Sequence, residues 1–280
     1  MTLNLNEERL KVYRAKTFCT MPGYQLLTVE ESVPFVDERG FIFFWPVKGF
    51  DLPSLWVAVA GDRPVPNEHD DPGHTTWGWK DAMLDQRVWY YGKLLRGKAT
   101  MVSLEVIPYF YVLTERMGDL DDYIIAYEEG KLSWEEKSIA DVLLNYGALH
   151  TIELRRRAHL ASASSKSRFD RAMTKLQSGL WVLPIGIARA GSWRYAFIYE
   201  LFDRWFPEIF EQARDITRRQ ARKHLASLYI RSVGAAEPKA IGRLFGWGKE
   251  LVDQVLGDLN EEGLAHEVSD GRWATRELIE

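Results

Sequence analysis

The sequence contains a single cysteine, Cys19, among its 280 residues. An intrachain disulfide needs two thiols and a cysteine-rich zinc site needs more, so both are excluded. Structural disulfides are typical of oxidising compartments, and their exclusion favours a reducing one. We therefore expect a cytoplasmic protein.

Long apolar runs are also missing. The most apolar stretches are residues 41–47, which include Pro46, and residues 55–60. Both are far shorter than the roughly 20 residues that a membrane-spanning helix needs. The first ten residues, MTLNLNEERL, are too polar for a secretory signal peptide. We expect no membrane partner.

The chain has no excess of positive charge. Its 36 lysines and arginines and 40 acidic residues give a net charge of −4. A protein that binds nucleic acid over its whole surface would be basic, so any such contact must come from a local basic face. The length exceeds that of one typical domain and favours two or three units. Apolar residues make up 46% of the chain, which is ample for a core.

Residues 145–200 contain the pattern around which the rest of the chain is organised. Phe169, Met173 and Leu176 follow an i, i+4, i+7 spacing, which predicts one buried face of a helix. We expect Thr151 to cap a shorter helix before it, Ser164 or Ser165 to cap this one, and two strands to follow. This order is that of a winged helix, whose second helix can enter a major groove while the hairpin lies on the backbone.

Basic residues are concentrated in the same stretch. Between residues 153 and 175, seven basic residues stand against two acids, Glu153 and Asp170, which gives a local charge of +5. A basic patch on a winged helix indicates nucleic-acid binding, although arginines also decorate solvated helix faces. The candidate contact residues are Arg155, Arg156, Lys166, Arg168, Arg171 and Lys175.

A second basic feature is a predicted hairpin turn. The segments 88–94 and 100–106 are strand-like, and Arg96 and Lys98 lie between them. We interpret this tip as a phosphate contact, with an ordinary solvated turn as the alternative.

The polar loop at 61–76 contains a different kind of chemistry. Its histidines and carboxylates are residue types that bind metals, but their spacing matches no metal-loop signature. Asp-Asp-Pro-Gly is ordinary turn chemistry, so we expect no metal and no cofactor. The polar residues in and just after this loop include Glu68, His69, Asp70, Asp71, His74 and Lys80.

The end of the chain repeats the central stretch. Gly147 corresponds to Gly234 and Leu180 to Leu264, at offsets of 87 and 84 residues. A nearly constant offset predicts a second winged helix. In its expected recognition helix Lys249 faces five acids, so packing or protein contact is expected there.

These patterns predict an α+β, mostly helical fold of tandem winged-helix modules. Two copies are expected from the repeat, and the N-terminal third, with its hairpin, is a divergent third candidate. The expected domains are 1–117, an N-terminal helical and hairpin module, 118–207, the central winged helix with the basic face, and 208–280, the C-terminal winged helix.

Three stretches of the chain resemble the AlkZ/YcaQ family of winged-helix DNA glycosylases, and more closely the AlkZ-related proteins grouped beside it. They are RGFIFFWPVKGFDLPSLWVAVAGDRPV, QRVWYYGKLLRGKATMVSLEVIPYF and RRRAHLASASSKSRFDRAMTKLQSGLWVLPIGIARAGSWRYAFIYELFDRWFP. The resemblance covers nearly the whole length. It implies tandem winged helices curved around a DNA-binding concavity, with double-stranded DNA as the partner. Members of the family remove alkylated bases from DNA.

The family's catalytic motif is absent from the matching position. That motif is Gln-aliphatic-Gln or Gln-aliphatic-Asp, and placing Gly40 on the glycine before it puts Phe43, Phe44 and Trp45 on the motif. Neither Phe nor Trp can accept a proton or hold a water through a carbonyl oxygen. The catalytic role therefore has no residue to transfer to, and Phe43 and Trp45 are expected in the core or stacked on a base or an abasic gap.

Three functions remain open. The favoured one is a DNA-binding relative, connected with repair, that lacks glycosylase activity. The second is an active glycosylase whose chemistry has moved to Asp70, Asp71, His74 and Lys80, because aspartates can activate water or stabilise an oxocarbenium-like centre. The third is a winged-helix module for protein contact or regulation, which the acidic net charge allows.

Overall fold

One pattern of elements occurs three times along the chain. The computed structural model describes residues 3–68 and 70–280. In each repeat a helix, a strand, two helices and a pair of strands follow one another. The last strand of each repeat lies between the other two, in the orders β1-β3-β2, β4-β6-β5 and β7-β9-β8. This is the topology of a winged helix, so the tandem fold is confirmed and the N-terminal third is the third copy.

The first unit follows a separate helix, α1 (Glu7–Thr17). The unit consists of α2 (Val29–Arg39), β1 (Phe41–Phe43), α3 (Leu55–Ala60), α4 (Thr75–Met83), β2 (Trp89–Gly92) and β3 (Thr100–Ser103). Thr28 and Glu31 form a capping box at the start of α2. The helix continues through Pro34 to Arg39.

The second unit follows α6 (Asp122–Glu128). It consists of α7 (Trp134–Tyr146), β4 (Leu149–His150), α8 (Thr151–Arg157), α9 (Lys166–Ser178), β5 (Val182–Ala188) and β6 (Ala196–Leu201). The predicted cap of α8 was wrong by one residue, whereas Ser165 is the N-cap residue of α9 as predicted, although its side chain makes no cap hydrogen bond. His150 rather than Thr151 caps α8, and its ring accepts a hydrogen bond from the Glu153 amide. Ser162 caps the turn before α9, because its hydroxyl accepts from the Ser165 amide.

The third unit ends the chain. It consists of α12 (Arg218–Val233), β7 (Ala235–Ala236), α13 (Pro238–Phe245), α14 (Lys249–Glu261), β8 (His266–Glu267) and β9 (Trp273–Ala274). A turn at Asp270-Gly271 joins β8 to β9, and Gly271 has a φ of 82° there. Such a positive φ favours glycine over residues with a Cβ atom.

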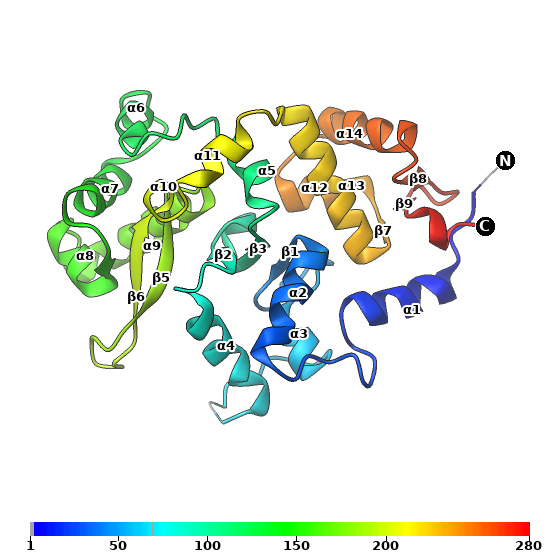
Figure 1. Cartoon of the computed structure of the whole chain (residues 1–280), viewed down its shortest axis with the longest axis horizontal. Helices are drawn as coiled ribbons and strands as arrows, with labels where there is room; N and C mark the ends of the chain where they lie inside the picture. The colour runs from blue at the N-terminus through cyan, green and yellow to red at the C-terminus, as the bar shows by residue number, and fades with distance from the viewer. Residues whose placement is uncertain (1–2, 69) are drawn as a thin grey trace.

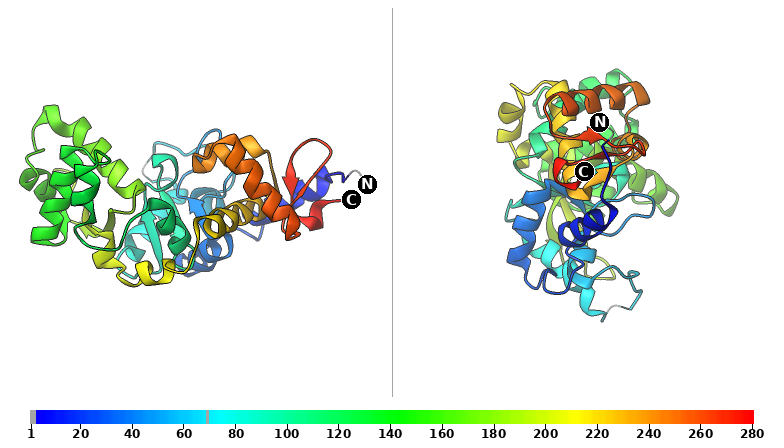
Figure 2. Two further views of the ribbon diagram at one scale, coloured as in Figure 1. Left: turned by 90° about the horizontal axis from the view of Figure 1, so that it is seen from above. Right: turned by 90° about the vertical axis from the view of Figure 1, so that its right-hand side faces the viewer.

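The units do not follow chain order in space. Figures 1 and 2 show the second unit (green) at one end, the first (blue and cyan) in the middle and the third (orange) at the other end. The connecting helices α5 (Ile107–Tyr111), α10 (Phe202–Trp205) and α11 (Glu208–Ala213) lie between them. The first and third units share one core, in which Phe41 and Tyr90 belong to the same cluster as Leu225 and Leu256. The second unit has its own core.

Two further observations complete the fold. Helix α1 packs on α12, and both ends of the described chain meet where Leu5 bridges Ile279. No helix within residues 3–68 and 70–280 is long and apolar enough to cross a membrane. The domain boundaries at 117 and 207 stay a prediction.

Candidate nucleic-acid interface

Helix α9 has one buried and one basic side. Phe169, Met173 and Leu176 are buried as predicted. On the exposed side lies a pocket of about 740 Å³, which we call the α9 groove. Its cationic lining residues are Lys166, Arg171 and Lys175 of α9 and Lys93 of the first unit, while Asp170 is the one acid among the described residues that line it. The groove therefore has an excess of positive charge, which attracts anions.

Several of the predicted contact residues are already engaged by the protein itself. The ion pairs are Arg156 with Glu153 (2.6 Å), Arg168 with Glu135 (3.2 Å) and Lys175 with Glu136 (3.2 Å). Arg155 donates to the carbonyl oxygens of Leu160 and Ser162. Lys166 and Arg171 have no ion pair within the described chain, so these two cations are the most available to a ligand.

Among the described acids, Glu153 is the one that most reduces the positive charge of the basic face. Its carboxylate accepts hydrogen bonds from Arg156 and from Arg157. The hydrogen bond from Arg156 is the main cause that lowers the pKa of Glu153 to about 2. Glu153 therefore stays ionised near neutral pH and holds two arginines away from a ligand.

The two cations of the predicted hairpin tip, Arg96 and Lys98, and Lys93 just before it lie in three different places. Lys93 reaches α9, where its ammonium donates to the Thr174 hydroxyl at 3.2 Å. The Arg96 guanidinium instead lies against Gly246, at the end of α13. Lys98 lines a small pocket of about 280 Å³ with Trp45 and Lys48. Of these residues, Lys93 was missed by the sequence analysis, because its position beside α9 depends on the packing of two units.

The wing of the second unit presents a feature that the sequence analysis also missed. Trp193 lies in the turn between β5 and β6 and is 88% exposed. Arg189 and Arg194 flank it, and neither has an ion pair among residues 3–68 and 70–280. The signal was present in the sequence as RAGSWR, an aromatic residue between two arginines in a glycine-containing turn.

The positions that match the family motif lie in apolar surroundings. Phe43 is fully buried and its ring packs edge-on against Phe50. Trp45 is half-buried at the edge of an aromatic cluster, with its ring centroid 5.1 Å from that of Trp56 and 6.0 Å from that of His74. Neither position offers a group that can activate water.

In the polar loop before α4, which we call the acidic loop, Asp71 and His74 contact neighbouring residues of the same loop. Both carboxylate oxygens of Asp71 accept from Arg63, at 2.6 and 3.0 Å, and one also accepts from the Gly73 amide. The Arg63 hydrogen bond is the main cause that lowers the pKa of Asp71. The His74 Nε2 lies 3.2 Å from the Pro66 carbonyl oxygen, and Asp70 is exposed. These contacts fix the loop at the start of α4.

Lys80 is separate from these acids. Its side chain is 1% exposed and contacts Asp81 and Tyr195, and no hydrogen bond or ion pair joins it to Asp70 or Asp71 in the described residues. Burial lowers the pKa of Lys80, while Asp81 raises it. His69 lies outside the described residues. In the rest of the chain no three His, Cys, Asp or Glu side chains are grouped as a metal site.

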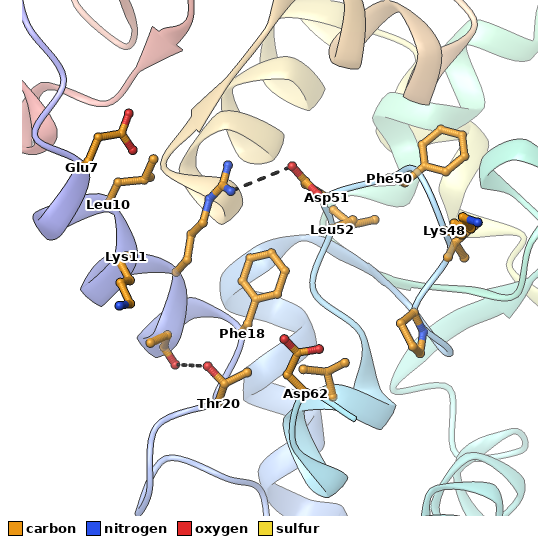
Figure 3. Close-up of a pocket in the computed structure, with 15 residues that line it drawn as sticks. Glu7, Leu10, Lys11, Phe18, Thr20, Lys48, Phe50, Asp51, Leu52 and Asp62 are labelled. Carbon is orange, nitrogen blue, oxygen red and sulfur yellow. Dashed lines mark hydrogen bonds and ion pairs between the residues drawn. The ribbon is translucent and has the colours of Figure 1, made fainter. Parts of the chain in front are cut away.

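A further pocket lies between α1 and the β1–α3 connection (Figure 3). It measures about 680 Å³. Its Arg14 guanidinium donates to the carbonyl oxygens of Val233 and Ala235 and lies 3.9 Å from Asp51. These contacts fix α1 on the third unit and engage Arg14 within the protein.

Together, the fold and the α9 groove define a protein of tandem winged-helix units in which α9 of the second unit has a basic exposed side. The model of the AlkZ-related family matches residues 26–246, and the chain belongs to that family. Among solved structures, the DNA glycosylase AlkZ of Streptomyces sahachiroi is similar, with a TM-score of 0.58 and 14% identity over 98% of this chain and 71% of that one. At this identity the likeness shows the fold alone. No curated protein matches the sequence.

Proposed function

We propose that this protein binds double-stranded DNA along α9 and the wing, without the glutamine-based hydrolysis of the winged-helix DNA glycosylases. The observation that carries the proposal is the α9 groove, where cations from two units converge on the exposed side of a recognition helix. Membership in the AlkZ-related family supports a DNA ligand connected with repair.

The dimensions and charges of the interface suit a duplex. A major groove about 12 Å wide admits an α-helix, and α9 exposes Lys166 in its first turn and Arg171 on the side opposite its buried stripe. Lys93 adds a cation that is held in place by its bond to Thr174. Arg189 and Arg194 extend the contact to the wing, where phosphate contacts would position the duplex.

The absence of hydrolysis is proposed from the groups at the motif. Phe43 and Trp45 supply neither a proton acceptor nor an amide. In the loop before α4, the carboxylate of Asp71 already accepts hydrogen bonds from Arg63 and from the Gly73 amide. An acid engaged in this way is a poor general base, because protonation would cost it both interactions.

The test is binding of a labelled duplex at several salt concentrations. We expect Lys166→Ala and Arg171→Ala each to weaken binding and to lower the salt slope by about 1. Arg9→Ala is the matched control, because Arg9 is exposed on α1 at the opposite end of the molecule. Salt-independent binding, or an equal loss in Arg9→Ala, would overturn the proposal.

The same samples can test for hydrolysis. Alkylated duplex incubated with the protein is heated in alkali, which cleaves abasic sites. We expect no cleavage above the control without protein. Cleavage that is abolished by Asp70→Asn or Asp71→Asn would show instead that the active site has moved to the acidic loop.

A further inference from the structure

All three units contribute to a second pocket, which we call the junction pocket. It measures about 410 Å³. Leu94 and Leu95 come from the first unit, Ser178 and Trp181 from the second, and Trp247 and Arg222 from the third. A pocket of this volume accommodates a small organic ligand.

The two tryptophans of the junction pocket are each held by a neighbouring side chain. The Trp247 ring stacks on Phe245, with centroids 4.4 Å apart and an interplanar angle of 17°. The Arg116 guanidinium lies 3.9 Å from the Trp181 ring centroid. Because both indoles are fixed before a ligand arrives, little side-chain entropy is lost when an aromatic ring packs against them.

A cation without a partner lies beside these rings. The Arg222 Nε is buried and has no hydrogen-bond partner, and no ion pair to Arg222 occurs in the described chain. Arg96 lies close by, against Gly246. None of the described residues that line the pocket is an acid. A buried donor without a partner is costly, and an anionic ligand would satisfy it.

The junction pocket borders the α9 groove. Ser178 lines both, and the neighbours Lys93 and Leu94 line one each. A duplex bound along α9 therefore passes the mouth of a pocket that offers aromatic rings, hydroxyl groups and a cation. These are the groups that bind an unpaired nucleotide, because every base has a face for stacking and every nucleotide has a phosphate.

We infer that the junction pocket receives an unpaired nucleotide of the DNA bound along α9. The base packs against Trp181 and Trp247, and Arg222 contacts the phosphate. The inference rests on the proposed function and deepens it, because it gives the protein a preference for duplexes in which a nucleotide is already unpaired. Such nucleotides leave the stack at lower cost than paired ones.

The experiment compares two labelled duplexes that differ by one unpaired adenosine. We expect the wild-type protein to bind the bulged duplex about tenfold more tightly than the matched one. Trp247→Ala and Arg222→Ala are expected to lose this preference while they keep the affinity for the matched duplex. Trp247→Phe, which keeps an aromatic ring, retains it. Gly179→Ala reduces it, because a Cβ there would lie 2.7 Å from the Trp181 ring.

The controls separate this inference from the proposed function. Trp134→Ala, at an exposed tryptophan outside both pockets, should keep the preference. Salt-dependent binding with no preference, or a preference that survives in Trp247→Ala and Arg222→Ala, overturns the inference and leaves DNA binding intact. Loss of salt-dependent binding to both duplexes removes the proposed function itself. A last control measures binding of deoxyadenosine monophosphate. If this nucleotide binds the wild type but not Arg222→Ala, and the wild type shows no preference between the duplexes, the pocket binds a free nucleotide. That result would overturn the inference that the nucleotide belongs to bound DNA.

Discussion

The ammonium group of Lys80 lies 3.1 Å from the hydroxyl oxygen of Tyr195, and this contact joins α4 of the first unit to the wing of the second. Asp81 accepts a hydrogen bond from both groups. Five aromatic rings surround the ammonium, the nearest being Phe197 at 4.7 Å. The buried charge is thus balanced by one carboxylate and by ring faces, which attract cations.

Replacing Lys80 with Met should destabilise the protein by about 3 kcal/mol, because removal of one partner leaves Asp81 without its buried cation. The measurement is the midpoint and slope of urea unfolding. Lys137→Met is the control, since Lys137 pairs with Asp141 at a partly exposed site and such pairs contribute less than about 1 kcal/mol. Equal losses in the two variants would contradict a structural role for Lys80.

The fold was predictable from sequence where its signals are local. The Ser133 capping box, the buried stripe of α9 and the turn at Asp270-Gly271 each depend on residues a few positions apart. The first unit was harder to recognise because the long loop at 61–74 separates α3 from α4. In the second unit the corresponding helices, α8 and α9, are separated by residues 158–165 only.

The sequence indicated which residue types form the candidate site, but not which of the charged side chains are paired within the protein. The Arg156–Glu153 pair has i, i+3 spacing and is readable from sequence. The Arg168–Glu135 pair joins residues 33 positions apart, so it requires the packing of α9 on α7. The approach of Lys93 to α9 likewise requires two units to pack together.

Glu153→Gln is expected to increase DNA affinity severalfold and to steepen its salt dependence. The change releases Arg156 and Arg157, and each new phosphate contact adds about 1 to the salt slope. Glu250→Gln in α14 is the control, because it makes the same change in net charge at an exposed residue of another unit. Duplex titration at several salt concentrations measures both quantities. Equal effects in the two variants would show that net charge alone is responsible.

The stability contributed by Glu153 should depend on pH in the acidic range. Its folded pKa of about 2 lies below the ordinary value of 4.5, so the unfolded state binds more protons between these values. The contribution is fully present above pH 4.5 and is lost as the pH falls towards 2. Urea midpoints of wild type and Glu153→Gln should therefore differ at neutral pH and converge in acid. A constant difference across this range would contradict the assignment.

Trp193 and Arg194 should affect DNA binding in different ways. Burial of an exposed aromatic ring against the sugars of the duplex backbone contributes about 1.5–3 kcal/mol, so Trp193→Ala is expected to weaken binding about tenfold or more with the salt slope unchanged. Arg194→Ala should lower both affinity and slope, because its contact is electrostatic. The pair is measured in one titration series. A changed slope in Trp193→Ala would indicate that the whole wing has moved.

Phe43→Gln tests whether the motif position retains any catalytic geometry. The side chain is fully buried against Phe50, so an amide there would lack water and partners and should cost about 3 kcal/mol. Trp45→Gln is the control, because its half-buried position at the cluster edge predicts a smaller loss. Urea unfolding and the alkali assay on alkylated duplex are measured on the same preparations. Base release by Phe43→Gln would show that the family's site survives around the lost residue. Destabilisation without release is expected, since a glutamine buried in this core cannot reach a water or a base.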